Sequence, residues 1–295
     1  MTTDPASIQN LAPLPLAVQA ALDDPSPDPG RRSTTVANDI PYSSVQWGEP
    51  TGRPLVLVHG LGSSSRNWWR LGPALAATGR RVIAPDQCGH GQTGNWAGHH
   101  AFRDNGQDLA AWVRASGLAV PELQVVGHSW GGMTVAALPI AGIRPATLVL
   151  IDPPTLPLAI MTTIVEDPGE RPREDVAATI QFLTPRNTAW STGDIEAKAR
   201  DLHDVDLEAA RDILVENGDW DGGLADISDP AAAGIDIWLI RGDPAAGGLI
   251  PDPAAAAFAA HLGDDHVLTI PGGHHSPMRS HPVDTTVALL LALGS

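Results

Sequence analysis

The chain of 295 residues has a single cysteine, Cys88, and only 3 Phe and 1 Tyr beside its 9 tryptophans. One thiol cannot form an intrachain disulfide, so no feature of the chain requires an oxidising compartment. No apolar run approaches the roughly 20 residues that span a bilayer. The apolar stretch 11–22 is interrupted by Pro13 and Pro15 and has no basic residue before it, so it is a poor signal peptide. We therefore expect a soluble, cytoplasmic protein.

Positive charge is also scarce. The chain carries 18 Lys and Arg against 34 Asp and Glu, a formal net charge of −16, without long blocks of one sign. This excess of acid argues against nucleic acid and anionic membranes as partners and leaves a small molecule as the expected one. No metal-ligand spacing such as His-Glu-x-x-His occurs, and Gly60-Leu61-Gly62 lacks the third glycine of a dinucleotide-binding motif. We expect no metal and no cofactor.

Residues 1–35 contain the acidic, proline-rich run 23–30, whose composition cannot bury enough apolar surface to order itself. We expect a flexible leader there, with one short helix between Pro15 and Leu22. After the leader, short apolar runs alternate with segments of helical length, a pattern that predicts a parallel sheet with right-handed crossovers. The expected strands are 55–59, 81–85, 123–126, 147–151, 235–240 and 266–270, with 42–47 at an antiparallel edge. The expected helices are 67–77, 105–115, 134–140, 253–261 and 283–293.

The heptapeptide 126–132, Val-Gly-His-Ser-Trp-Gly-Gly, follows an apolar run and precedes an alanine-rich segment that can form a helix. It places Ser129 at a strand-to-helix turn, with Gly127 and Gly131 two positions to either side. A Cβ at either glycine would collide with the neighbouring strand or helix. A Gly-x-Ser-x-Gly pentapeptide such as 127–131 also arises by chance in a chain with 30 glycines. Here, however, the apolar run before it and the alanine-rich segment after it match the strand and helix that the motif requires. The segment resembles the nucleophile elbow of the α/β-hydrolase family, which makes Ser129 the expected nucleophile.

The resemblance covers residues 36–295 and implies a fold. That fold is a mostly parallel, doubly wound α/β-hydrolase sheet with a helical cap inserted after the sixth strand. We assign the core to residues 36–152 and 231–295. The cap is assigned to residues 153–230, which are acidic, punctuated by proline and too long to be a simple connection between two strands.

The expected general base lies in the run 270–277, Ile-Pro-Gly-Gly-His-His-Ser-Pro, after the last strand. In the family's Pro-Gly-x-Gly-His-Ser-Pro pattern, the histidine directly precedes Ser-Pro. The resemblance therefore assigns the base to His275 and places His274 where glycine is usual. His274 remains the alternative base. Otherwise its side chain is expected to shift this loop or to line the substrate pocket.

Two aspartates compete to be the third member of the triad. Most of the family carries this acid about three residues past the glycine that ends the strand after the cap. Here Ala245 holds that position after Gly242, and the aspartate is displaced to Asp243. A subset of the family carries the acid at the end of the strand before the cap, where Asp152 stands. Because the carboxylate must reach the imidazole, we favour Asp152, keep Asp243 as the alternative, and expect the other aspartate to cap a loop.

The oxyanion hole is expected from two backbone amides. Trp130, the residue after the nucleophile, supplies one, and the His-Gly-Leu-Gly run that begins at His59 resembles the family loop that supplies the other from Leu61. His59 itself is expected to brace that loop. The indoles of Trp130, Trp190 and Trp220 are candidate walls of the pocket.

The resemblance implies a cofactor-independent serine hydrolase. Ser129 attacks an ester-type carbonyl, His275 accepts and returns the proton, and water releases the acyl-enzyme. Because no basic cluster is visible in the sequence, we expect a small to medium apolar ester or lactone as substrate. C–C bond hydrolase, thioesterase and perhydrolase activities use the same triad and remain alternatives. A ligand receptor of the same fold with slow turnover, or a non-catalytic member with a misplaced acid, is the rival of another class.

Overall fold

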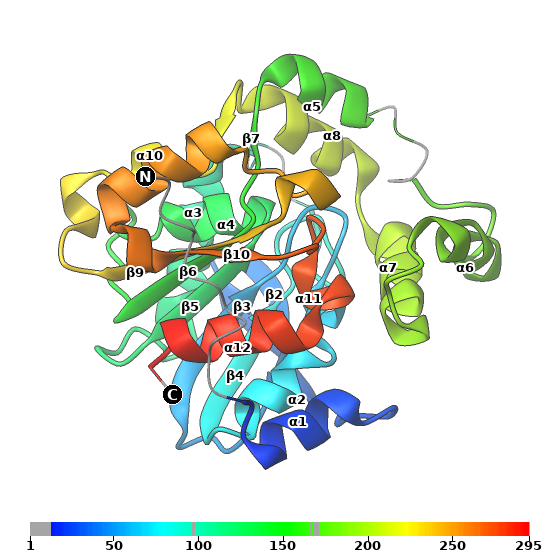
Figure 1. The fold of residues 1–295 in the computed structure, drawn as a ribbon, viewed down its shortest axis with the longest axis horizontal. Helices are drawn as coiled ribbons and strands as arrows, with labels where there is room; N and C mark the ends of the chain where they lie inside the picture. Colours follow the sequence, from blue (N-terminus) through cyan, green and yellow to red (C-terminus); the bar gives the residue numbers. More distant parts are fainter. Residues whose placement is uncertain (1–12, 96–97, 99, 166, 168–170, 295) are drawn as a thin grey trace.

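The computed structural model describes residues 13–95, 98, 100–165, 167 and 171–294. An eight-stranded sheet forms its centre, in the order β1-β2-β4-β3-β5-β6-β9-β10 (Figure 1). β2 pairs antiparallel with β1 and β4, and the remaining pairs are parallel, which confirms the mostly parallel sheet. Its strands are β1 (Arg31–Ala37), β2 (Ile40–Trp47), β3 (Arg53–Val58), β4 (Arg80–Pro85), β5 (Gln124–His128), β6 (Thr147–Ile151), β9 (Asp236–Gly242) and β10 (Val267–Ile270).

The central strands are buried on both faces. Every residue of β5 and β6 is buried, which explains why these segments read as continuous apolar runs rather than as an alternation. Helices cover both faces, as the doubly wound fold requires: Trp112 and Phe258 belong to the apolar cluster on one face, and Leu75 and Leu289 to the cluster on the other. The covering helices are α1 (Leu16–Asp23), α2 (Leu71–Ala76), α3 (Phe102–Ala115), α4 (Trp130–Ala136), α10 (Asp252–Leu262) and α12 (Pro282–Ala292).

The N-terminal segment differs from the flexible leader that its composition predicts. The short helix is present as α1, and Val18 and Leu22, four residues apart on one side of it, are buried in the same cluster as α2 and α12. Further on, β1 pairs with residues 40–46 of β2, so β1 is the antiparallel edge of the sheet and β2 lies inside it. The prediction of a flexible leader is therefore wrong for residues 13–35. Residues 1–12 of the predicted leader lie outside the described part of the chain.

A helical insertion separates β6 from β9. Figure 1 shows α5 to α8 gathered on one side of the molecule, away from α1 and α2. Among the described helices of the whole chain, none is both long and apolar enough to cross a membrane. The elements of the insertion are β7 (Thr155–Leu156), α5 (Leu158–Val165), α6 (Val176–Leu183), α7 (Thr192–Asp204), α8 (Leu207–Glu216), β8 (Trp220–Asp221) and α9 (Leu224–Ile227).

Helix α7 docks on the segment that follows β3. Arg66 lies 3.1 Å from a carboxylate oxygen of Asp201, and Arg70 lies 2.9 Å from one of Asp194. The indole of Trp69 also donates to Asp194, at 2.9 Å. Both aspartates are buried, so these ion pairs are screened little by solvent. They hold one wall of the insertion against the loop that carries Leu61.

Candidate active site

Ser129 stands at the sharp turn between β5 and α4. Its φ of 55° and ψ of −126° are rarely adopted by a side-chain-bearing residue and cost about 1–3 kcal/mol. The turn is possible because glycine flanks it. A Cβ on Gly127 would lie 2.3 Å from the carbonyl oxygen of Gly131, and one on Gly131 would lie 2.4 Å from that of His59. The sequence pattern therefore predicted this turn for the right steric reason.

Replacing Gly127 by alanine is expected to lower the free energy of unfolding by about 3 kcal/mol or more, because the new methyl group meets rigid backbone. Gly127 has no positive φ, so the effect is steric alone. The matched control is Gly218→Ala, where φ is +65° but nothing lies within 4 Å of the new Cβ, and the expected cost is about 1 kcal/mol. Urea denaturation of both variants checks this order, and equal losses would contradict it.

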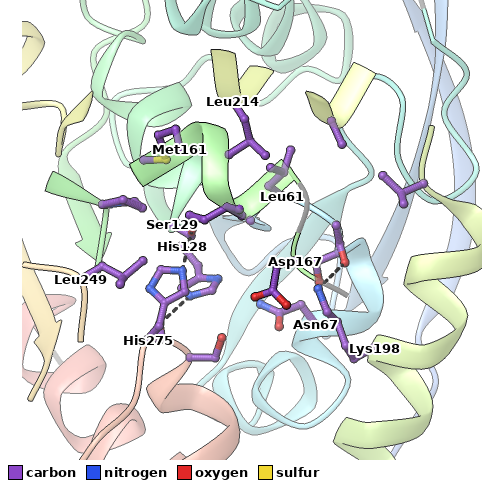
Figure 2. A pocket seen from close by; sticks show the side chains of 18 of the residues that line it. Leu61, Asn67, His128, Ser129, Met161, Asp167, Lys198, Leu214, Leu249 and His275 are labelled. Carbon is purple, nitrogen blue, oxygen red and sulfur yellow. Dashed lines mark hydrogen bonds between the residues drawn. The ribbon is translucent and has the colours of Figure 1, made fainter. Parts of the chain in front are cut away.

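Three side chains from distant parts of the chain form a continuous hydrogen-bonded series, and Figure 2 shows two of them, Ser129 and His275. The Oγ of Ser129 lies 2.9 Å from Nε2 of His275, and Nδ1 of His275 lies 2.8 Å from Oδ2 of Asp152. A carboxylate only accepts, so Nδ1 carries the proton and Nε2 is left to accept from the serine hydroxyl. This is the tautomer in which a histidine can take the proton of an attacking alcohol.

Asp152 is fully buried directly after β6 and has a positive φ of 41°. Besides His275, its carboxylate accepts from the backbone amide of Gly242 at 3.0 Å and from that of Leu249 at 2.9 Å. Three donors thus compensate its charge in a place that water does not reach. They also fix the direction from which the carboxylate meets the imidazole.

Asp243 does not contact His275 in a hydrogen bond. Its carboxylate accepts instead from the backbone amides of Gly272, at 3.0 Å, and of Ala245, at 2.9 Å. These bonds hold the pKa of Asp243 below its ordinary value, the one to Gly272 contributing most. Asp243 thereby clamps the start of the histidine loop, which is the loop-capping role expected of the other aspartate. The side chain of His274 is exposed and lines the cavity.

The loop after β3 brings a second backbone amide close to Ser129. A Cβ on Gly60 would lie 2.9 Å from that of Ser129, so only glycine allows this approach. The neighbouring amide of Leu61 and the amide of Trp130 make no hydrogen bond to other described backbone groups. Two such donors beside a nucleophile can receive the negative charge that develops on a carbonyl oxygen.

Two buried histidines brace this loop. The ring of His59 bonds the Gly60 carbonyl at 2.8 Å and accepts from the amide of Gln87 at 2.9 Å. The ring of His90 bonds the Cys88 carbonyl at 3.0 Å and accepts from the amide of Gly62 at 3.1 Å. Each ring therefore donates through one nitrogen and accepts through the other, which only a neutral imidazole can do. The bracing role expected of His59 agrees with these bonds, whereas no role of His90 was predicted from the sequence.

A third histidine, His128, precedes the nucleophile and was not singled out in the sequence. Its Nε2 donates to the backbone carbonyl of His275 at 2.9 Å, and the two rings lie 5.0 Å apart. Burial, followed by the nearby charge of His275, holds the pKa of His128 well below its ordinary 6.5. His128 thus ties the end of β5 to the histidine loop as a neutral group. This contact joins residues that are 147 positions apart in the chain, so no local sequence pattern indicated it.

The protein is expected to lose stability as the pH falls below about 6.5. Burial lowers the pKa of His59, and burial with the nearby charge of His59 lowers that of His90 to about 3. Because the folded-state pKa values of these groups and of His128 lie below the unfolded value, the unfolded chain binds more protons, and stability present above pH 6.5 is lost toward pH 3. The loss is about 1.4 kcal/mol per pH unit for each fully shifted histidine.

Urea denaturation at pH 7.5, 6.5, 5.5 and 5.0 measures this dependence. The lowered pKa of Asp86 contributes only below its unfolded value of 3.8, so it stays outside this window. His90→Asn, which removes one titrating ring, is expected to have a shallower slope than the wild type. Equal stability at pH 5.0 and 7.5 would contradict the assignment of neutral buried rings.

A cavity of about 650 Å³ opens onto Ser129 and His275 between the sheet and the insertion. Trp190 and Trp220, which the sequence proposed as pocket walls, both line it, as does Leu61. Trp130 does not line it with its indole. That ring is fully buried and packs 5.0 Å from the ring of His90, because the elbow turns the side chain after the nucleophile into the core.

A family model described as "Alpha/beta hydrolase family" matches residues 55–289, which include the elbow, the insertion and the histidine loop. The chain belongs to the alpha/beta hydrolase family. The crystal structure of E-2-(acetamidomethylene)succinate hydrolase superposes on this hydrolase with a TM-score of 0.74 at 21% identity, over 90% of this chain and 99% of that one. At that identity the likeness concerns the fold alone.

Curated relatives match shorter stretches of this alpha/beta hydrolase. A dihydrolipoyllysine-residue acetyltransferase component of an acetoin cleaving system from Pseudomonas putida is 38% identical over 104 residues, 34% of this chain and 27% of its own length. A 2-hydroxymuconate semialdehyde hydrolase from Pseudomonas sp. (strain CF600) is 38% identical over 91 residues, 30% of this chain and 32% of its own. The chain thus matches about a third or less of the length of each, and these similarities do not by themselves give a substrate.

Proposed function

We propose that this alpha/beta hydrolase cleaves a carboxylic ester or lactone of small to medium size through an acyl-enzyme on Ser129. The observation that carries the proposal is the pair of contacts at His275, 2.9 Å to the Ser129 hydroxyl and 2.8 Å to Asp152. A serine hydroxyl is a weak nucleophile at neutral pH until an adjacent base accepts its proton. The buried, orienting carboxylate is what makes His275 such a base.

In the proposed reaction, Ser129 Oγ attacks the carbonyl carbon while its proton passes to Nε2 of His275. The amides of Leu61 and Trp130 receive the oxyanion, and Asp152 stabilises the imidazolium. The carbon–oxygen bond of the ester then breaks, and His275 gives the proton to the leaving alcohol oxygen. A water molecule repeats the sequence on the acyl-enzyme, which releases the acid and regenerates Ser129.

The size and lining of the cavity support an ester or lactone of modest size. A volume of about 650 Å³ lies within the range of small-molecule sites. Figure 2 shows Met161, Leu214 and Leu249 around the end that holds Ser129 and His275. These apolar side chains favour an apolar group beside the scissile bond.

A panel of substrates tests the reaction type. It comprises 4-nitrophenyl esters of two to eight carbons, five- and six-membered lactones, a β-diketone for C–C cleavage, and an ester with hydrogen peroxide for perhydrolysis. We expect sustained turnover of esters or lactones, with an initial burst of nitrophenol equal to the enzyme concentration where deacylation is slow. A burst without turnover would favour a receptor. Turnover of the diketone alone would replace ester cleavage by C–C cleavage.

A further inference from the structure

The cavity has two different ends. The end around Ser129 has an apolar lining, whereas the other end is lined by charged and polar side chains. Asn67, Lys198 and Arg279 line it, and their side chains are almost entirely withdrawn from bulk solvent, at 4%, 7% and 4% exposed. In the sequence, Lys198 lies 131 residues and Arg279 lies 212 residues after Asn67. The fold brings a buried ammonium, a buried guanidinium and a buried amide to one cavity wall, here called the cationic end.

The cationic end is built onto the loop that carries the Leu61 amide. Lys198, from α7, donates to the carbonyl of Gly62 at 3.0 Å. Arg279, in α11 (Pro277–Ser280), donates to the hydroxyl of Ser63 at 3.3 Å. Gly62 and Ser63 are the next two residues after Leu61, so both cations bond to the loop that supplies the Leu61 amide. The positive charge of Arg279 also contributes to the low pKa of His128, which adjoins Ser129.

Each polar group of this end is held in a defined direction. Nε of Arg279 donates to Oδ1 of Asn67 at 3.0 Å, and its guanidinium stacks 4.6 Å over the ring of Trp190. Because Oδ1 of Asn67 is taken by this bond, its Nδ2 is the remaining donor. That Nδ2 is buried and has no hydrogen-bond partner. A buried amide donor without an acceptor is destabilising, and an acceptor on a ligand would recover that loss.

Other charged residues line the cavity, but they differ in burial. Arg171, Arg211 and Glu208 are exposed, so solvent screens them. Asp167, also exposed, points into the same part of the cavity as Asn67 and Lys198 (Figure 2). A carboxylate of the chain itself is therefore compatible with the cationic end.

We propose that the cationic end binds a carboxylate of the substrate, so that the preferred substrates are esters or lactones that carry a free carboxylate group. This inference rests on the proposed hydrolase function. A carboxylate offers acceptor positions for Asn67, Lys198 and Arg279 and brings a negative charge beside two positively charged side chains. Those cations are already desolvated and oriented by the fold, so binding requires little further reorganisation.

The test compares two pairs of esters, each matched in size. Mono-4-nitrophenyl adipate and 4-nitrophenyl hexanoate differ only in the carboxylate or methyl group at the end of a six-carbon acyl chain. The second pair, 4-acetoxybenzoate and 4-methylphenyl acetate, puts the carboxylate on the leaving group. We expect kcat/KM to be at least about tenfold higher for the acidic member of one pair, as the strength of a charged hydrogen bond implies.

Variants then test whether the cationic end causes this preference. Arg279→Met and Lys198→Met are each expected to lower the acidic-to-neutral ratio of kcat/KM by about tenfold, mainly through KM. Using the ratio removes any general loss of activity or folding, which affects both esters alike. The matched control is Arg103→Met, which removes the same charge from an exposed ion pair with Asp226 outside the cavity and should keep the wild-type ratio.

The outcomes separate this inference from the function on which it rests. Turnover of all four esters with no preference for an acidic member, or an unchanged ratio in both Met variants, would overturn the carboxylate site and leave the hydrolase intact. If none of the four esters is turned over and a fluorophosphonate does not label the wild type, the hydrolase proposal itself fails.

Discussion

Ser129→Ala is expected to lower kcat/KM for a hydrolysed ester by about 10⁴- to 10⁶-fold, the scale of nucleophile removal in serine hydrolases. The Oγ is the atom that forms the covalent bond, and no other hydroxyl bonds to Nε2 of His275 among the described residues. Steady-state assays of wild type and variant measure the loss.

Folding of that variant is expected to be intact. Removing Oγ deletes no packing contact of size, and alanine does not relieve or add to the strain at φ 55°. Thermal unfolding should therefore change little, and Ser33→Ala, on the exposed strand β1, serves as the matched control with full activity. A Ser129→Ala protein that keeps more than a tenth of the wild-type rate would exclude Ser129 as the nucleophile.

Asp152→Asn is expected to lower kcat/KM by about 10⁴-fold. An amide in place of the carboxylate presents an NH₂ group either to the Gly242 amide, in place of Oδ1, or to both the Leu249 amide and His275 Nδ1, in place of Oδ2, and it cannot stabilise the imidazolium. The histidine is then held in the wrong tautomer or direction. Assays from pH 6 to 9 with one ester measure the effect.

Asp243→Asn is the matched comparison, because it makes the same chemical change in the aspartate that competes with Asp152 in the sequence. Its carboxylate bonds only to the amides of Gly272 and Ala245 in the described structure, so the expected loss is about tenfold or less, through a looser histidine loop. A greater loss for Asp243→Asn than for Asp152→Asn would reverse the assignment of the acid.

The sequence could predict those parts of the site that depend on neighbouring residues. The elbow is local: the clash that a Cβ would cause at Gly127 involves Gly131, only four residues away. The parallel strands are local too, because burial on both faces leaves a continuous apolar run in β5 and β6. The resemblance of one short loop to the family pattern predicted His275 as the base. Its contact with Ser129 was expected because the family's serine and histidine act together.

Features that depend on distant contacts were not predictable in the same way. The sequence favoured Asp152 but kept Asp243 as the alternative, because the choice turns on which carboxylate faces the imidazole and that direction depends on contacts between distant segments. The cationic end joins residues 67, 198 and 279, which no spacing rule connects. The composition of the first 35 residues suggested disorder, but two buried side chains, Val18 and Leu22, suffice to dock α1.

The central claim is that His275 activates Ser129 for attack. Reaction of the intact protein with a fluorophosphonate, followed by peptide mapping by mass spectrometry, tests it most directly. We predict one adduct per chain, located on Ser129, absent in Ser129→Ala and formed at least about a hundredfold more slowly in His275→Ala, since general-base assistance contributes 10²- to 10⁴-fold. An adduct on another residue, or equal labelling rates with and without the imidazole of His275, would contradict the account.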